Sequence, residues 1–279
     1  MPTNFTHTTD AGNTLNLTVY GAEKFGDQPC VVYLHGFKGF KDWGFVPYAG
    51  RYFAERGFTF VTFNFSHNGI GDDPLVISEL DKFEKNTFSL EVAEAKEVYR
   101  LCAHTDFFGA YLNLHKIGVI GHSRGGGIAL LSGESTPEIS AVATWAAVST
   151  YDRYDKKTRQ AWHKRGHGEV VNGRTGEVYR LGMDLLEDIE KRSKNSLNIL
   201  DAARRMEKPL LLLHGEKDVT VPYYEAEQLN IYAPPATTEM RLIPDTGHTF
   251  GAVHPFEQTT PQLEQLLEAS SDFFDQHLR

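Results

Sequence analysis

Residues 116–127 read K-I-G-V-I-G-H-S-R-G-G-G, and this stretch decides the fold. An apolar run at 117–120 leads into the pentapeptide G-H-S-R-G centred on Ser123, and small apolar residues follow at 128–131. This order predicts a buried strand, a sharp turn and a helix. The pentapeptide has the pattern G-x-S-x-G of a nucleophile elbow, in which a strained turn projects a serine into a cleft.

The two glycines of the pentapeptide, at positions 121 and 125, have a physical reason. A side chain at either position would crowd the adjoining strand or helix. The helix that starts after Ser123 would direct its free N–H groups and its positive end at the same spot. The alternative is a glycine-rich turn with a chemically idle serine, so the remaining chain has to decide.

Length and composition favour one globular domain. The 279 residues, 41% hydrophobic and 23% charged, fit a single α/β domain with an insertion. The net charge of −9 argues against a nucleic-acid binder, which would present a basic face. The chain contains no apolar run near 18 residues, so no membrane span is expected.

The N-terminus and the cysteines bear on location. The first residues lack the basic and apolar regions of a signal peptide. Cys30 and Cys102 fall in a predicted strand and a predicted helix, where buried thiols are expected rather than a disulfide. We therefore expect a cytoplasmic protein.

Strand and helix patterns alternate along most of the chain. Strands are predicted at 4–9, 14–20, 30–34, 58–65, 117–120, 141–148, 210–213 and 239–243. Helices are predicted at 47–56, 87–104, 223–232 and 261–278. The first two strands should form a hairpin. The alternation predicts an α/β fold with a mostly parallel central sheet and helices on both faces.

Residues 150–208 interrupt this alternation. Turn residues between β-formers predict a hairpin at 170–179, and a helix is predicted at 183–194. We interpret the segment as an inserted cap of a hairpin plus helices, which divides the core into residues 1–149 and 209–279.

A serine hydroxyl is a weak nucleophile unless a histidine takes its proton and an acid orients that histidine. In open α/β sheets, sites lie beyond the carboxyl ends of the strands. Asp218 follows the strand predicted at 210–213, and His248 follows the one at 239–243. Together with Ser123 they form a predicted catalytic triad.

Each member of this triad has a competing interpretation. Asp218 could cap the helix that follows it, and His248 could be an ordinary loop histidine. Asp245 is the rival acid, but it lies only three residues before His248. The remaining candidates are expected to shape loops or to lie on the surface: His35, His122, His214, His163 and His167.

No H-E-x-x-H or paired C-x-x-C spacing occurs among the 12 His and two Cys, so no metal site and no cofactor is predicted. The oxyanion of an acyl-transfer reaction needs two backbone donors. The N–H of Arg124, next to the nucleophile, is one. We expect the N–H of Phe37, after the strand at 30–34, to be the other.

Four stretches together carry a family resemblance that covers nearly the whole chain: H-G-F at 35–37, G-H-S-R-G at 121–125, D-V-T-V-P at 218–222 and G-H at 247–248. The chain resembles the α/β-hydrolase superfamily. It is most similar to the dienelactone hydrolase-like and cinnamoyl (feruloyl) esterase-like branch, which carries a cap after the sixth strand. The resemblance implies Ser123 as nucleophile, Asp218 as acid and His248 as base, with the amides of Phe37 and Arg124 as oxyanion donors. Dienelactone hydrolases proper use cysteine, so a serine at 123 favours an esterase.

The sequence thus predicts a serine hydrolase that cleaves small carboxylic esters through an acyl-enzyme. A thioesterase or an S9-like peptidase is the alternative among enzymes. A non-catalytic ligand-binding protein on a hydrolase fold is the alternative from another class.

The predicted cap should influence which ester is taken. Residues 151–208 carry 14 Lys and Arg against 10 Asp and Glu, a net charge of +4, which leaves −13 for the rest of a chain whose total is −9. These charges either coat the outer face of the cap or favour a negatively charged substrate. Aromatic walls are predicted from Tyr151, Tyr154, Trp162 and Tyr179. We expect short-chain or aromatic esters to be preferred.

Overall fold

A computed structural model describes residues 1–71, 73, 76–109, 117–172 and 176–279. Within these ranges an eight-stranded sheet runs in the order β1-β2-β4-β3-β5-β6-β9-β10. Its strands are β1 (Thr3–Thr8), β2 (Thr14–Tyr20), β4 (Thr59–Phe63), β3 (Cys30–Leu34), β5 (Ile117–His122), β6 (Ile139–Trp145), β9 (Leu210–Gly215) and β10 (Thr238–Ile243). All neighbours from β4 to β10 pair in parallel, whereas β1 and β2 form an antiparallel hairpin that joins β4 antiparallel.

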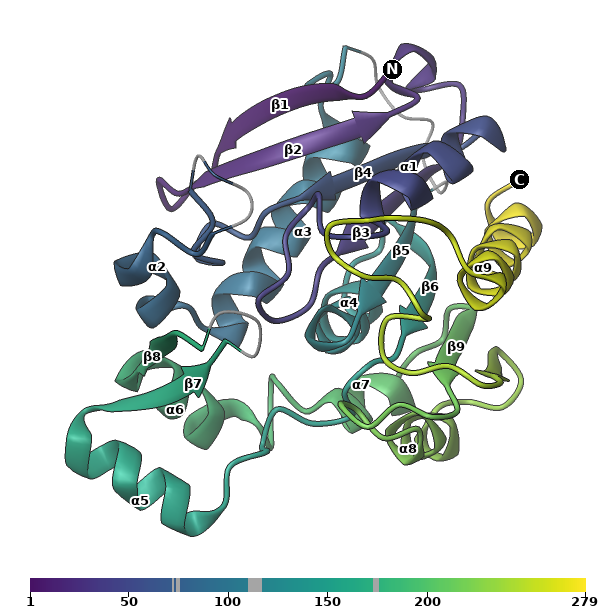
Figure 1. The fold of residues 1–279 in the computed structure, drawn as a ribbon. Coiled ribbons are helices and arrows are strands. Elements are labelled where there is room, and N and C mark those ends of the chain that lie inside the picture. Colours follow the sequence, from purple (N-terminus) through teal and green to yellow (C-terminus); the bar gives the residue numbers. More distant parts are fainter. Residues whose placement is uncertain (72, 74–75, 110–116, 173–175) are drawn as a thin grey trace.

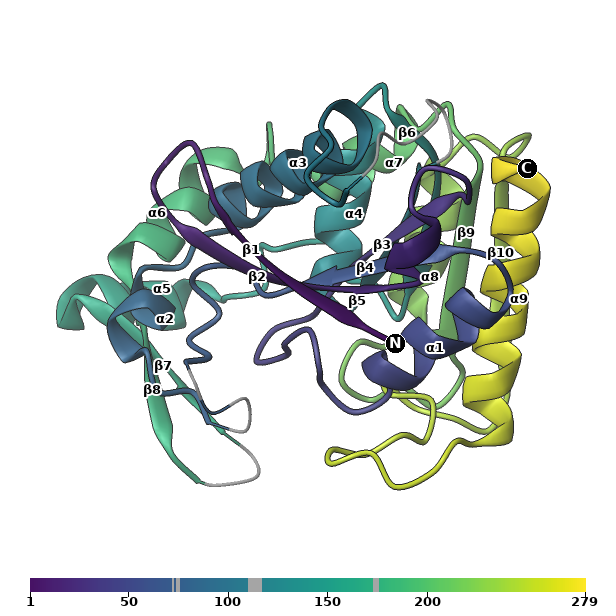
Figure 2. The ribbon, with the colours of Figure 1, turned by 90° about the horizontal axis from the view of Figure 1, so that it is seen from above.

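Helices cover both faces of this sheet (Figure 1, Figure 2). On one face lie α1 (Val46–Glu55) and α9 (Pro261–Leu278). The other face carries α3 (Phe88–His104), α4 (Arg124–Glu134), α7 (Ile199–Arg204) and α8 (Tyr224–Tyr232). Strand β3 illustrates how both faces of the sheet are buried, because Val32 packs into one apolar cluster and the adjacent Val31 packs into the other. A strand buried on both faces must be a continuous apolar run. The predicted α/β-hydrolase fold is confirmed.

Residues 150–208, here called the β6–β9 segment, leave the sheet after β6 and return to it at β9 (Figure 1). They contain α5 (Lys156–Arg165), an antiparallel pair of β7 (His167–Val171) and β8 (Val178–Gly182), α6 (Met183–Arg192) and α7. The predicted hairpin is confirmed, although its turn at 173–175 lies outside the described residues. The segment docks on the core where Asp188 accepts hydrogen bonds from the N–H and hydroxyl of Ser89, at 2.9 and 2.6 Å. Its division from the core at 150 and 208 stays a prediction.

The structure differs most from the predicted elements at the end of β6 and at α5. The strand expected at 141–148 ends at Trp145, because Ala146 has a φ of 50° and turns the chain toward the elbow. The residues that follow are buried there rather than in the sheet, so their apolar character misled the assignment. The helix α5 was not predicted, because Trp162 is its only buried residue and no apolar period marks it.

Candidate active site

Ser123 lies between the last residue of β5 and the first residue of α4, with φ 57° and ψ −120°. A positive φ is strained for a residue with a side chain and persists only where the surroundings enforce it. The Ser123 N–H donates to the Trp145 carbonyl at 2.8 Å, and the Ser123 carbonyl accepts from the N–H of Val148 at 3.2 Å. Strand β6 and its extension therefore hold the strained turn in place.

Glycines surround this turn because no side chain fits. A Cβ on Gly121 would overlap the Gly125 backbone, and a Cβ on Gly125 would overlap the carbonyls of residues 34 and 35, so the predicted crowding is confirmed. A Cβ on Gly36 would lie 3.0 Å from the Cβ of Ser123 and 3.5 Å from its hydroxyl oxygen. The loop after β3 thus lies directly against the nucleophile candidate.

His248 and Asp218 lie on the loops after β10 and β9 and contact each other. His248 Nδ1–H donates to Asp218 Oδ2 at 2.7 Å, and Asp218 Oδ1 accepts the N–H groups of Thr220 and Val221 at 2.8 and 2.9 Å. Burial alone would raise the pKa of Asp218, but hydrogen bonds from His214 and His248 outweigh it and hold the pKa well below its usual range. The buried Asp218 is therefore ionised and fixes the orientation of the His248 ring.

The two candidate acids, Asp218 and Asp245, differ in their positions relative to His248. Asp245 is exposed and pairs with Lys217 Nζ at 2.6 Å, whereas Asp218 contacts His248 directly. The helix α8 begins at Tyr224 without a side-chain cap, so Asp218 is not its N-cap. Of the two aspartates, Asp218 is the one that orients His248.

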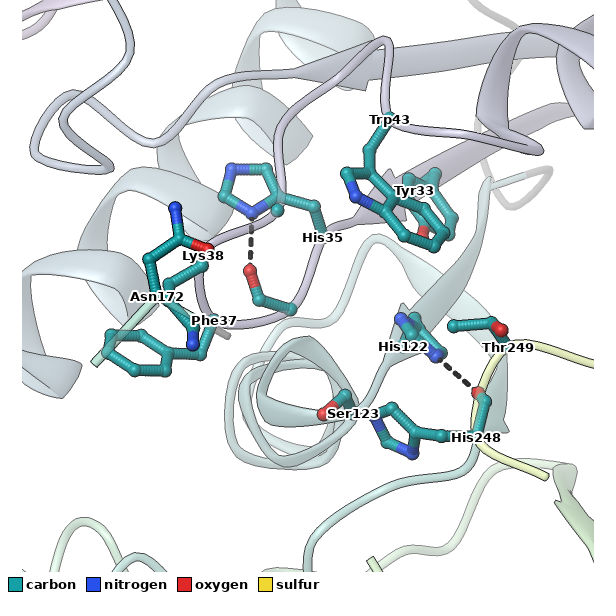
Figure 3. Close-up of a pocket in the computed structure, with 12 residues that line it drawn as sticks. Tyr33, His35, Phe37, Lys38, Trp43, His122, Ser123, Asn172, His248 and Thr249 are labelled. Atoms are coloured by element: carbon teal, nitrogen blue, oxygen red, sulfur yellow. Dashed lines mark hydrogen bonds between the residues drawn. The ribbon is translucent and has the colours of Figure 1, made fainter. Parts of the chain in front are cut away.

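Two histidines beside the site support backbone groups. His122 Nε2–H donates to the His248 carbonyl at 3.0 Å (Figure 3). Burial lowers the pKa of His122 to about 3 and that of His35 to about 4, so both rings are neutral. His35 Nε2 accepts the N–H of Phe65 at 3.3 Å, which leaves Nδ1–H to donate to the Gly36 carbonyl at 2.9 Å.

The bond from His35 orients the peptide group between Gly36 and Phe37. In a trans peptide the C=O and N–H groups point in opposite directions. The Gly36 carbonyl faces His35 and also accepts the N–H of Gly39 at 3.0 Å, so the Phe37 N–H points away from both. Together with the contact between Gly36 and Ser123, this geometry fits the predicted donor, although the oxyanion role itself stays a prediction.

Arg124 is held at both its backbone and its side chain. Its carbonyl accepts the hydroxyl of Tyr151 at 3.0 Å, and its Nε donates to Glu91 Oε2 at 2.9 Å. The guanidinium lies 4.2 Å from the centre of the Phe88 ring. These contacts fix the first residue of α4, whose amide is the other predicted oxyanion donor.

Two cavities meet at Ser123. The Trp43 cavity, about 220 Å³, is bounded by Tyr33, Trp43 and Thr249 among others (Figure 3). The Tyr151 cavity, about 430 Å³, has a mainly apolar lining. Its apolar and aromatic residues include Phe88, Val148, Tyr151, Tyr154, Val170, Leu185 and Val221. Ser123 and His248 line both cavities, and their side chains lie next to each other in Figure 3.

Of the four predicted aromatic wall residues, Tyr151 and Tyr154 line the Tyr151 cavity, and Trp162 and Tyr179 line neither cavity. Trp162 is 1% exposed and packs edge-on against Tyr154 at 5.1 Å. Tyr179 packs on Phe83 at 5.5 Å. Both are structural anchors of the β6–β9 segment rather than cavity walls.

Several lining residues were not predicted. Phe88 lies at the start of the helix predicted at 87–104, and Trp43 lies in a loop with no local signal. Arg153 belonged to the basic segment, but nothing in the sequence distinguished it from the other cations there.

None of the helices in the described ranges combines the length and the apolar character needed to cross a bilayer. Over the same ranges, no three His, Cys, Asp or Glu side chains gather as a metal-binding group would.

Comparison with known proteins agrees with this geometry. Residues 29–167 match the family described as alpha/beta hydrolase fold. An uncharacterized peptidase of Bacillus subtilis, YuxL, is 29% identical over 170 residues, which are 60% of this chain but only 23% of that protein.

Solved structures are similar over the whole chain. Est1E from Butyrivibrio proteoclasticus, solved with ferulic acid bound, superposes with a TM-score of 0.72 at 17% identity and covers 98% of this chain and 99% of its own. The alpha/beta hydrolase GrgF from Penicillium sp. sh18 gives 0.73 at 17% identity, over 100% and 99%. The family match over residues 29–167 and these superpositions agree: the chain has the α/β-hydrolase fold.

Proposed function

We propose that this protein is a serine esterase that hydrolyses small carboxylic esters through an acyl-enzyme. One observation carries the proposal. The strained Ser123 shares both cavities with His248, whose Nδ1–H is bonded to the buried, ionised Asp218. A neutral imidazole held in this tautomer leaves Nε2 as a base for a serine hydroxyl.

The proposed reaction has two halves. His248 Nε2 takes the proton of Ser123 as its oxygen attacks the ester carbonyl, and it then gives that proton to the departing alcohol. Asp218 stabilises the imidazolium that forms in between. The amides of Phe37 and Arg124 bind the oxyanion. Water, deprotonated by His248, then attacks the acyl-enzyme and releases the acid.

The β6–β9 segment is proposed to act as the cap of this site. Tyr151, Arg153, Tyr154, Val170 and Leu185 all come from it and form a wall of the Tyr151 cavity. At about 430 Å³ this cavity has room for an aromatic or short acyl group. The ferulic acid bound by Est1E supports an aromatic ester as the first substrate to test.

A peptidase is the second candidate, because the curated relative is described as one. Values of kcat/KM on a matched methyl ester, thioester and anilide of the same aromatic acid separate the activities. The proposal expects the ester to be the best substrate, and a superior anilide would favour the peptidase.

The non-catalytic alternative is tested with a fluorophosphonate probe, which reacts only with an activated serine. We expect stoichiometric labelling of the wild type and none of Ser123→Ala. A folded wild type that stays unlabelled would contradict the proposal and favour a binding protein.

A further inference from the structure

We propose that the Tyr151 cavity binds a carboxylate group of the substrate through Arg153. The inference rests on the proposed esterase function and narrows its substrate class. The preferred ester would carry a second, free carboxylate, on its acid or its alcohol part, beyond an apolar spacer.

Charge around the Tyr151 cavity is one-sided. Lys38, Arg124 and Arg153 line it, and none of its described lining residues is an aspartate or glutamate. A cavity with cationic walls of low dielectric raises the local concentration of anions and holds them strongly.

Hydrogen bonds to Glu225 hold the guanidinium of Arg153 in one orientation. Both carboxylate oxygens of Glu225 accept from the same Nη1 of Arg153, at 2.7 and 2.9 Å. Glu225 has a side-chain exposure of 4% and also accepts the N–H and the hydroxyl of Ser149, at 2.8 and 3.2 Å. These bonds fix the carboxylate, so it in turn fixes Arg153.

This arrangement leaves donors available. Among the described residues, Nε and Nη2 of Arg153 have no acceptor, and the side chain is 36% exposed. An arginine uses two parallel N–H donors to bind a carboxylate, and pre-organisation lowers the entropy lost on binding. Arg153 therefore has N–H donors available for a ligand, and it lines the same cavity as Ser123.

Arg124 also lines the same cavity and adds positive potential to it. Its side chain is 9% exposed, and its Nη2 is buried without an acceptor in the described parts of the chain. Its partner Glu91 is buried as well, and burial raises the pKa of that carboxyl despite the nearby guanidinium. The pair does not supply a negative surface that would repel an anion from Arg153.

The rest of the cavity defines the spacer. Phe88, Tyr151, Tyr154 and Leu185 line the same cavity as Ser123 and Arg153 and supply aromatic and apolar surface there. Such walls favour a benzene ring or a short hydrocarbon chain. A benzoate-type ester with a para carboxylate combines this spacer with an anion.

Two pairs of substrates test the inference, each comparing a carboxylate with its carboxamide isostere. Monomethyl terephthalate against methyl 4-carbamoylbenzoate places the charge on the acid part. The pair 4-acetoxybenzoate and 4-acetoxybenzamide places it on the alcohol part. Product release followed by chromatography gives kcat/KM for each, and the ratio of anion to amide is the readout.

We expect the wild type to favour the anion in at least one pair. Arg153→Gln should lower that ratio by about tenfold to a hundredfold, the range for a charge-assisted hydrogen bond. Arg153→Lys keeps the charge without the fork and should retain part of the preference. Raising the salt concentration should weaken it, because Arg153 is partly exposed.

The control is Arg165→Gln, in α5 of the same segment, where Arg165 pairs with Glu169 at 3.1 Å and lines neither cavity. It removes the same charge and should leave the ratio unchanged. If Arg153→Gln and Arg165→Gln lowered the ratio equally, the preference would come from long-range electrostatics, and the assignment to Arg153 would be overturned. Hydrolysis of the neutral esters with no anion preference in either pair would overturn it while the esterase function stands. If no ester is hydrolysed, the esterase function and the inference fail together.

Discussion

The two walls of the candidate site are built in different ways. The core wall places Ser123, Asp218 and His248 on short turns at strand ends, where backbone hydrogen bonds and neutral buried histidines fix each residue. The wall from the β6–β9 segment consists of side chains on partly exposed elements, held by a few polar anchors such as Glu225 and Asp188. Under the proposed function, the residues of the core wall carry out the reaction, whereas the residues of the β6–β9 segment select the substrate.

The contrast between the two walls depends first on Ser123 of the core wall being the nucleophile. Ser123→Ala should lower kcat/KM on p-nitrophenyl butyrate on the order of 10⁴-fold or more, because the nucleophile is lost. Ser135→Ala is the control, since the Ser135 hydroxyl only donates to the Leu131 carbonyl at the end of α4, at 3.1 Å. Wild-type rates in the Ser123 variant would place the reaction elsewhere.

Asp218→Asn tests the orientation of the base. The amide no longer stabilises the imidazolium and favours the wrong tautomer of His248, so we expect a loss of kcat of about 10³- to 10⁴-fold. Asp245→Asn, at the rival acid, should keep the rate. The reverse order of the two effects would reassign the acid.

Substitutions of Trp162 test whether this residue stabilises the fold or contacts the substrate. Trp162→Ala removes a 1%-exposed side chain and should destabilise the protein by about 3–5 kcal/mol. Urea unfolding measures this loss. With Trp162→Phe, which keeps most of the packing, kcat/KM should change less than twofold. A large rise in KM with unchanged stability would make Trp162 a substrate contact after all.

The smallest expected effect lies in the core, at Glu94. Burial raises the pKa of Glu94 from 4.5 to about 7, despite hydrogen bonds from Ser66. Between these two pKa values the folded protein holds a proton on Glu94 that the unfolded chain has lost, so the contribution of Glu94 to stability falls as pH rises from about 4.5 to 7 and then levels off. The neutral, buried His35 and His122 act in the opposite direction below about pH 6.5, so the contribution of Glu94 is measured as the difference in stability between the wild type and a Glu94 variant. The loss is at most about 3 kcal/mol.

Thermal melts between pH 4.5 and 8 check this dependence. The stability of the wild type minus that of Glu94→Gln should fall over this range, whereas the same difference for Glu23→Gln, an exposed position, should stay constant. A difference between the wild type and Glu94→Gln that stays constant from about pH 4.5 to 7 would show that Glu94 is ionised throughout.

The core wall could be predicted from the sequence because its signals are local. Apolar runs locate the strands, and the residues just after them must meet at one edge of a parallel sheet. Ser123, Asp218 and His248 were found in this way, and the glycines around Ser123 indicated the tight turn.

The segment wall could not be predicted in the same way. Phe88 reaches the Tyr151 cavity from α3, and only the tertiary fold brings it to the β6–β9 segment. The aromatic residues of that segment look alike in the sequence, but some line the cavity and others only pack in the interior. Tyr154 lines the cavity while Trp162 packs behind it, and no sequence period separates the two.

The pairing of β6 with β9 has a consequence for how such a protein can change. Val142 and Ala143 lie beside Leu210 and Leu211 in a parallel pairing, so the β6–β9 segment leaves at the carboxyl end of β6 and has to cross the sheet to re-enter at the amino end of β9. Insertions and deletions between these ends alter loop-closure entropy only slowly with length. The helix α7 has to be kept, because its Ile199, Ala202 and Ala203 pack in the core. We therefore expect mutational libraries confined to residues 150–198 to yield many folded proteins with altered substrate preference.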